Sequence, residues 1–412
     1  MKKNILIIGF VWPEPKSSAA GSRMMQLIAV FQAQEYTVTF ATACAKSANA
    51  FDLESIGVKT AAIAINSASF DTFISTLNPE IVMFDRFNVE EQFGWRVAEQ
   101  CPKALRVLDT EDLHSLRRGR HQAYKDNAEF NTHYLFNDTA KREIASIYRC
   151  DLTLVISEAE MALLKEQFKV NERLLLYLPF MLDSVSVAAQ QQLPSYSKRK
   201  HFVTIGNFLH EPNYNSILYL KESIWPLIKQ QLPAAEMHIY GAYATQKVTQ
   251  LHNEKEGFLI TGFAENVATV MQNAKVCLAP LRFGAGLKGK IVDAMVSGTP
   301  CVTTKVGAEG LFGNLNPNAF IEDTPNAFAN KAIELYSTEF IWNTFQNNGF
   351  EVVNQRFNKL HFGALLVRRL KSLITDLESH RLHNFTGQLL MHHTLQSTKF
   401  MSKWIEAKNR KD

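Results

Sequence analysis

The sequence predicts an α/β protein of two Rossmann-like domains that face each other across a cleft, followed by a helical C-terminal extension. Three observations lead to this prediction. Strand-like apolar runs alternate with helical stretches in both halves of the chain. The 412 residues exceed the length at which one hydrophobic core keeps growing, so two domains are expected. Glycine turns follow several of the runs, as at the ligand-binding edge of an open parallel sheet.

The first half of the chain begins with five strand-like runs, at residues 4–10, 37–42, 81–85, 105–110 and 152–157. The N-terminus has the charged and apolar parts of a signal peptide, but Trp12-Pro13-Glu14-Pro15 follows where a small-residue cleavage site is needed. No stretch reaches the length of 18 apolar residues typical of a membrane-spanning helix. We therefore expect a cytoplasmic protein that contacts a membrane at most peripherally.

Composition and charge exclude several classes of protein. The net charge of +4 is small for the length, which argues against a protein whose whole surface binds nucleic acid. The five cysteines are scattered without a Cys-x-x-Cys pair, which favours reduced thiols over disulfides or a zinc site. Residues 331–412 contain twelve Lys and Arg against seven Asp and Glu, so the basic character gathers at the C-terminus.

Small residues follow the first strand. Ser17 to Gly21 leave room for a ligand or a second domain to approach the backbone. Ser22 is predicted to cap a helix that begins near Arg23, which would place a helix N-terminus and an arginine at the carboxyl end of a strand. A plain surface loop is the alternative.

The densest group of reactive side chains follows the strand at 105–110. Asp112 and His114 could supply a carboxylate and an imidazole to one pocket, although such a cluster is also typical of a solvated turn that caps a helix. Arg117, Arg118 and Arg120 follow and either bind an anionic acceptor or solvate the helix. We expect no metal site, because no second ligand follows His114 at a useful spacing.

A composition change divides the chain. The run LLLYLPFMLD reads as the last strand of a first domain at 1–183, and the polar, Gln-rich stretch 184–200 reads as a linker. Alternation of strands and helices restarts at His201 and predicts a second domain at 201–345. We expect the helices of 346–412 to pack across both domains, with a basic face that is either solvated or bound to anionic lipid.

The most informative stretch is Cys277 to Gly310. A strand at 276–281 is followed by Gly284 and Gly286, and a helix is predicted from Leu287 to about Ser297, where Gly298 and Pro300 end it. Lys288 and Lys290 then fall in the first turn, where the helix dipole disfavours a positive charge unless an anion is bound.

Asp293 lies on the same face of this helix as Lys290 and suggests sugar hydroxyls beside a phosphate. The glycines also fit the G-x-G-x-x-G pattern of dinucleotide sites, but that pattern should follow the first strand of its unit. An ordinary glycine loop with solvated lysines is the other alternative. The pattern favours a pocket for a phosphorylated molecule with hydroxyl groups.

The segment APLRFGAGLKGKIVDAMVSGTPCVTTKVGAEGL resembles the donor-binding segment of the retaining nucleotide-sugar glycosyltransferases of family 4, glycosyl transferases group 1. PEPKSSAAGSR resembles the N-terminal glycine loop of that family, DTEDLH its acceptor-side segment, and TIGNFLHEPN the first strand of its donor domain. The resemblance covers most of residues 1–375 and implies the glycosyltransferase B fold.

The resemblance also implies roles for individual residues. Lys288 and Lys290 would hold the donor diphosphate, and Asp293 would bind the ribose hydroxyls. His114 and Asp112 would lie near the transferred sugar as the catalytic pair. The other implied donor contacts are glycines and apolar residues: Gly21, Gly206, Gly262, Phe263, Gly284, Gly286 and Leu287.

The sequence departs from this family at two places. The first glutamate of its paired-glutamate motif has no counterpart near Arg282 and Phe283. Asn207 and Asn213 stand in the region where many relatives have an arginine and a lysine on the diphosphate, a task that Lys288 and Lys290 would take over.

The implied activity is transfer of a sugar from a nucleotide-diphosphate donor to a polysaccharide or lipid-linked acceptor, retaining the anomeric configuration. It would use no metal and no cofactor other than the nucleotide sugar as co-substrate. The basic tail would allow peripheral contact with an anionic membrane. A nucleotide-sugar epimerase on the same fold and a non-catalytic sugar-nucleotide-binding protein are the alternatives.

Overall fold

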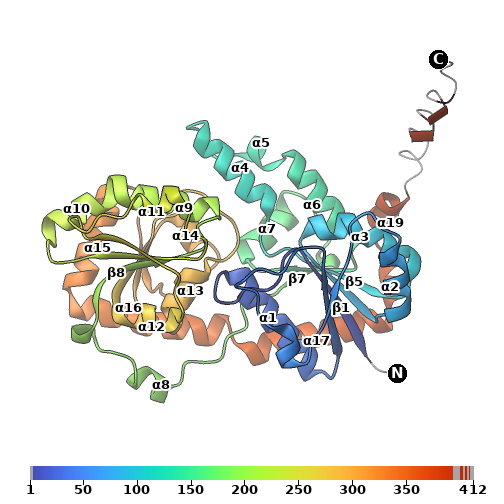
Figure 1. Ribbon diagram of the computed structural model, residues 1–412, viewed down its shortest axis with the longest axis horizontal. Helices are drawn as coiled ribbons and strands as arrows, with labels where there is room; N and C mark the ends of the chain where they lie inside the picture. Colours follow the sequence, from blue (N-terminus) through green and yellow to red (C-terminus); the bar gives the residue numbers. More distant parts are fainter. Residues whose placement is uncertain (1–2, 393–399, 402–403, 406–407, 409–412) are drawn as a thin grey trace.

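The computed structural model describes residues 3–392, 400–401, 404–405 and 408, which form two α/β domains and a set of C-terminal helices (Figure 1). In domain 1 the strand order is β3-β2-β1-β4-β5-β6-β7, and all neighbours pair in parallel. The strands are β1 (Asn4–Gly9), β2 (Thr37–Thr42), β3 (Lys59–Ala62), β4 (Ile81–Asp85), β5 (Leu105–Asp109), β6 (Leu152–Val155) and β7 (Leu175–Tyr177).

Domain 2 repeats the parallel architecture with the strand order β10-β9-β8-β11-β12-β13. Its strands are β8 (Lys200–Ile205), β9 (Met237–Tyr240), β10 (Phe258–Gly262), β11 (Ala274–Ala279), β12 (Cys301–Thr303) and β13 (Ala319–Ile321). Each domain has core clusters on both faces of its sheet, as buried parallel strands require. The two parallel sheets confirm the predicted fold class.

Helices connect the strands of each sheet. In domain 1 they are α1 (Ala19–Ala33), α2 (Ser69–Leu77), α3 (Phe87–Gln100), α4 (His114–Lys125), α5 (Thr132–Leu135), α6 (Asp138–Arg149) and α7 (Glu158–Glu166), with 3-10 turns at Leu53–Ile56 and Glu172–Leu174. In domain 2 they are α9 (Glu211–Tyr219), a π-helical turn (Leu220–Ile224), α10 (Trp225–Gln231), α11 (Gln246–Thr249), α12 (Val267–Asn273), α13 (Gly289–Val296), α14 (Lys305–Ala308), α15 (Pro325–Ser337) and α16 (Glu339–Arg356).

The chain crosses between the domains at two places that lie side by side. The first crossing contains α8 (Val187–Gln191) and a 3-10 turn at Tyr196–Lys198. After α16, whose Phe350 and Val353 pack in the core of domain 2, the chain returns to domain 1 as α17 (Lys359–Thr375), and its Leu366 and Leu370 pack in the domain 1 core. Leu182 bonds to the backbone on both sides of Asn358, which joins the two crossings.

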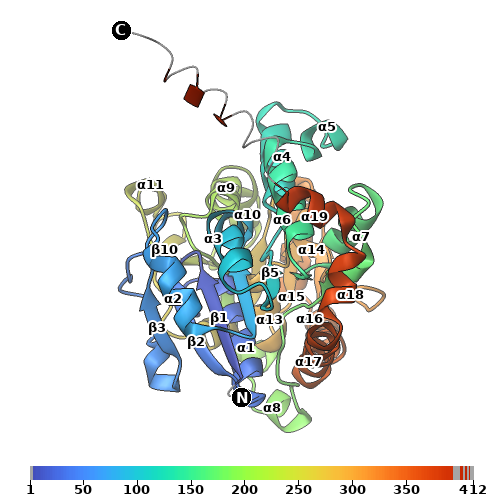
Figure 2. The same ribbon diagram turned by 90° about the vertical axis from the view of Figure 1, so that its right-hand side faces the viewer.

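Two short helices, α18 (Leu377–Leu382) and α19 (Phe385–Met391), complete the described C-terminal helices and lie against domain 1 (Figure 2). Within the described residues, no helix is both long and apolar enough to span a bilayer.

Two helix starts differ from the sequence prediction. Helix α1 begins at Ala19 rather than near Arg23, because Ser18 is the capping residue and its Oγ accepts from Gly21 N at 3.0 Å. The predicted cap, Ser22, instead donates to Pro15 O. Helix α13 begins at Gly289, so Lys288 stands just before the helix and only Lys290 lies in its first turn.

Candidate active site

The loop after β5 brings Asp112 and His114 together. Asp112 Oδ1 lies 3.4 Å from His114 Nε2, and its other oxygen pairs with Arg117. Burial alone would raise the pKa of Asp112, but the positive charge of Arg117 holds it below its usual range, so it is ionised at neutral pH. Burial lowers the pKa of His114 to about 3 in spite of Asp112, which leaves the imidazole neutral. The pair can therefore offer a carboxylate and an uncharged imidazole.

A glutamate of α6 accepts hydrogen bonds from the N-terminus of α4. Glu143 accepts from His114 N at 2.7 Å and from Ser115 N at 2.8 Å. Burial raises the pKa of Glu143 to about 7, against the effect of these hydrogen bonds. The carboxyl group of Glu143 therefore caps the N-terminus of α4. Its two hydrogen bonds also hold the backbone of His114 in place.

The glycine loop of domain 2 packs directly on the Asp112 loop. Gly286 has a φ of +63°, and a Cβ on it would lie 2.9 Å from Asp112 Cβ. Both its left-handed backbone and this close approach require glycine. Leu287 is buried after it in the core of domain 2. The predicted donor loop and the predicted catalytic loop are therefore in contact.

Lys288 turns back onto this glycine loop. Its Nζ donates to Gly286 O at 2.6 Å and to Ala285 O at 3.2 Å. The side chain is buried, and burial lowers the pKa of Lys288 to about 8, partly offset by Glu309. Its ammonium group thus lies at the base of the loop, directly before the N-terminus of α13.

Lys290 contacts the first turn of α9. Its Nζ donates to Asn213 Oδ1 at 2.9 Å, and burial lowers the pKa of Lys290 to about 8. A Cβ on Gly206 would lie 2.7 Å from Asn213 Nδ2, so Gly206 is needed for this packing. His210, the N-cap residue of α9, has an exposed side chain, and desolvation by the surrounding protein lowers its pKa to about 4. Lys290, Asn213 and His210 form one polar wall of the site.

Asp293, one turn after Lys290, is accessible to solvent. Protein nevertheless surrounds it closely enough for desolvation to raise its pKa to about 7. Near neutral pH the carboxyl group can therefore either accept or donate a hydrogen bond.

The N-terminal glycine loop meets α13 from the other domain. A Cβ on Gly289 would lie 2.6 Å from Ala19 Cβ, so the N-termini of α1 and α13 touch. A Cβ on Gly21 would lie 2.4 Å from the carbonyl carbon of Glu14, so Gly21 lets the loop fold onto the helix. Glu14 itself accepts from Tyr243 OH of domain 2 at 2.7 Å.

Gly262 and Phe263 lie apart from the lysines, at the end of the edge strand β10, which is separated from β11 by β9 and β8. Gly262 has a φ of +86° with open space where a Cβ would be, and Phe263 is half-buried. Lys16 of the N-terminal loop pairs with Glu265 at 3.6 Å, which brings this region to the domain interface.

Three charged groups make contacts that were not predicted. Arg120 and Glu160 lie at the domain interface, whereas Arg23 lies inside domain 1. Arg120 binds Glu309 through two bonds of 2.7 and 2.8 Å and donates to Gly284 O at 2.9 Å, so it joins the domains. Arg23, expected beside a ligand, is fully buried and paired with Asp109 at 2.9 Å. Glu160, also fully buried, accepts from Gly286 N. The sequence carried no signal for these pairs, because the partners are far apart along the chain.

A cluster of metal-ligand side chains lies elsewhere. His201, Glu236 and His238 have ligand atoms within 4.8 Å of one another, at the amino ends of β8 and β9 and thus at the opposite edge of the domain 2 sheet. The two imidazole rings are stacked, so their in-plane lone pairs do not converge, and His201 Nδ1 accepts from Glu236 N. This arrangement favours a hydrogen-bonded surface cluster.

Comparison with known proteins bears on the fold and on domain 2. Residues 199–338 match the family model for glycosyl transferases group 1, and a search of curated proteins found no match. Sucrose-phosphate synthase from Thermosynechococcus elongatus superposes with a TM-score of 0.69 at 18% identity, over 91% of this chain and all of that one. Anabaena Alr3699/HepE, in complex with UDP and glucose, gives 0.67 at 14% identity over 90% and 99% of the two chains.

A third neighbour is WaaG, a glycosyltransferase involved in lipopolysaccharide biosynthesis. It gives a TM-score of 0.58 at 12% identity over 85% of this chain and 95% of that one. Identities this low show the fold alone, while the family match covers the domain that contains the glycine loop, Lys288 and Lys290. Residues 199–338 therefore match the glycosyl transferases group 1 family, and the chain as a whole has the two-domain fold of these neighbours.

Proposed function

We propose that the chain transfers a sugar from a nucleotide-diphosphate donor to a polysaccharide or glycolipid acceptor, with retention of the anomeric configuration. The observation that carries the proposal is that the segment bearing Lys288 and Lys290 touches the other domain at two points. Gly286 packs against Asp112, and Gly289 at the start of α13 packs against Ala19. One domain thus supplies an anion-binding helix end, and the other supplies the polar pair that faces it.

The donor diphosphate would lie at the N-terminus of α13. The backbone N–H groups of Gly289 and Lys290, the first two residues of α13, have no partner within the helix, and the Lys290 side chain adds a positive charge beside them. Lys288 would reach the same phosphates by leaving the carbonyl groups of Ala285 and Gly286. These groups can neutralise a leaving diphosphate, which supports transfer without a metal or an added cofactor.

The sugar and the acceptor would meet at the Asp112–His114 loop. The ionised Asp112 faces Nε2 of the neutral His114, so Nε2 carries the proton and Nδ1 can accept a hydrogen bond from a sugar hydroxyl. Asp293 would bind ribose hydroxyls from α13. Retention follows from the resemblance to family 4. HepE, solved with UDP and glucose, and WaaG, which serves lipopolysaccharide biosynthesis, support a uridine-type donor and an acceptor of the cell envelope.

Turnover of nucleotide sugars tests the proposal. The purified protein is incubated with UDP-, GDP- and ADP-sugars, and release of the nucleoside diphosphate is measured with and without EDTA. We expect slow hydrolysis of one donor that EDTA does not inhibit. Binding without hydrolysis would favour a non-catalytic sugar-nucleotide-binding protein, and the absence of both binding and turnover would contradict the proposal.

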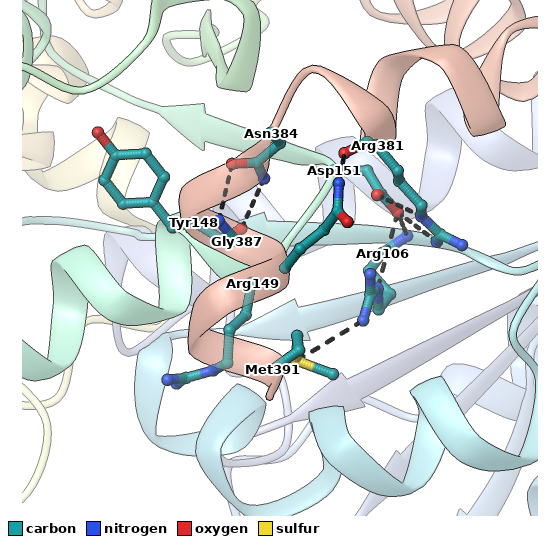
Figure 3. A pocket seen from close by; sticks show the side chains of 9 residues that line it. Arg106, Tyr148, Arg149, Asp151, Arg381, Asn384, Gly387 and Met391 are labelled. Atoms are coloured by element: carbon teal, nitrogen blue, oxygen red, sulfur yellow. Dashed lines mark hydrogen bonds and ion pairs between the residues drawn. The ribbon is translucent and has the colours of Figure 1, made fainter. Parts of the chain in front are cut away.

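We also propose that the C-terminal helices contact an anionic membrane. Helices α18 and α19 dock on domain 1 through polar groups (Figure 3). Arg381 pairs with Asp151 at 2.7 Å, and Asn384 donates to Tyr148 O at 2.7 Å. These contacts surround a cavity of about 180 Å³ at the amino ends of β5 and β6, at the edge of the sheet away from the active site.

The apolar side chains of these helices point the other way. Leu382, Phe385 and Leu389 are 71%, 73% and 60% exposed. Most of the final basic segment, 397–412, lies outside the described residues, but Phe400 and Trp404 within it are exposed as well. An exposed apolar face followed by a lysine-rich segment is typical of a helix that lies in the interface of an anionic bilayer.

Vesicle binding tests this contact. The full chain should bind phosphatidylglycerol vesicles more tightly than phosphatidylcholine vesicles, and less tightly as salt is added. Replacing Leu382, Phe385 and Leu389 together with serine should weaken binding at least about tenfold, because less apolar surface is buried. Undiminished binding of this triple variant, or no preference for the anionic lipid, would exclude the contact.

A further inference from the structure

Glu160 lies at the point where the two active-site loops meet. It belongs to α7 of domain 1 and is fully buried. Its Oε1 accepts from Leu113 N at 3.0 Å and from Gly286 N at 2.8 Å. Leu113 stands between Asp112 and His114, whereas Gly286 belongs to the glycine loop of the other domain. A single oxygen atom therefore joins the two loops.

The second carboxyl oxygen of Glu160 is buried and has no hydrogen-bond partner among the described residues. Burial and the nearby charge of Asp112 raise the pKa of Glu160 to about 8, so the group is a neutral acid at pH 7. An uncharged carboxyl group avoids the cost of an isolated buried charge. Its shape and its acceptor oxygen are those of glutamine.

The contact between the two loops leaves no room for a side chain at position 286. A Cβ there would already lie 2.9 Å from Asp112 Cβ, and the residue has a left-handed backbone. The N–H group of Gly286 is thus held by Glu160 and, in this arrangement, is not free for a phosphate. Separation of the domains would break the hydrogen bond between Gly286 N and Glu160 Oε1.

We propose that Glu160 is a positioning residue that locks the glycine loop of domain 2 onto the Asp112–His114 loop when the domains close. Because its hydrogen bonds go only to backbone N–H groups, Glu160 acts by holding the two loops against each other rather than by touching a substrate. This inference goes beyond the proposed function, since the lock forms whatever molecule is bound.

Hydrogen–deuterium exchange of the protein without nucleotide tests the lock. E160A should accelerate amide exchange at Gly286 and Leu113 on the order of tenfold, the effect of losing one buried hydrogen bond. E160Q should restore near wild-type exchange, because its amide oxygen can accept both bonds. E158A is the matched control: Glu158 lies on the same helix and pairs across the interface with Arg356 at 2.6 Å, but it touches neither loop.

Three results would overturn the proposal: unchanged exchange in E160A, no rescue by E160Q, or equal acceleration in E158A. If E160A does not fold, E160D replaces it, because the shorter side chain keeps the carboxyl group but cannot reach both N–H groups. Since no nucleotide is present, failure of the donor assay leaves this measurement unaffected, so the two proposals can fail separately.

Discussion

Replacing Lys288 and Lys290 together with alanine should weaken binding of the nucleoside diphosphate by more than about tenfold, as expected when two charge-assisted contacts to phosphate are lost. Lys290 lies in the first turn of α13, where its Nζ bonds to Asn213, and Lys288 stands directly before that helix. Burial lowers the pKa of each to about 8 in the free protein. Isothermal titration calorimetry with the nucleoside diphosphate measures the change.

The sign of the pH dependence follows from these pKa values. The ammonium form binds the phosphate, so affinity should fall as the pH rises through 8, and this fall should be absent from the double variant. Lys305 provides a matched control, because it is an exposed lysine of the same domain, and K305A should bind normally. Unchanged affinity in the double variant would show that the diphosphate binds elsewhere.

Asp109→Ala should lower the free energy of unfolding of domain 1 by about 3 to 5 kcal/mol, the usual cost of leaving one partner of a buried ion pair alone. Arg23 and Asp109 are both completely buried, and two nitrogens of the guanidinium group bond to the carboxylate. Arg23 also donates to Leu178 O at 2.6 Å, so it is held in place when the carboxylate is removed. Urea denaturation followed by circular dichroism measures the loss.

The control for this prediction is an exposed ion pair in the same domain. Lys165 and Glu172 lie 2.8 Å apart, and both side chains are more than a third exposed. K165A should change the free energy of unfolding by less than about 0.5 kcal/mol. A loss below about 1 kcal/mol in D109A would mean that the Arg23–Asp109 pair does not stabilise the carboxyl edge of the sheet.

Local pattern predicted the inner strands of both sheets and the glycine loop, but not the short edge strands β3 and β13. The strand β11 and the helix α13 fall within two residues of their predicted bounds, because glycines precede the helix and Gly298 and Pro300 follow it. The predicted start of α1 was wrong, because the sequence alone does not distinguish Ser18 from Ser22 as the capping residue. The fold of the proline-rich loop decided between them, by placing Pro15 O beside Ser22.

The charged interior of the site could not be predicted. Arg23 looked like an anion-binding residue beside a loop, but its partner Asp109 is 86 residues away. Glu160 and Glu143 lie in ordinary helical sequence, and only the packing of α7 and α6 brings them to backbone N–H groups. Pairings of this kind depend on tertiary structure, whereas glycine turns and helix ends are set by neighbouring residues.

The structure of the protein bound to a nucleoside diphosphate tests the central claim most directly. The account predicts phosphate oxygens at hydrogen-bonding distance, about 2.7 to 3.2 Å, from Lys290 Nζ and from N–H groups of the first turn of α13. The ribose should lie toward Asp293, and the terminal phosphate toward His114. A nucleotide bound away from α13, or one whose phosphates touch neither Lys288 nor Lys290, would contradict it.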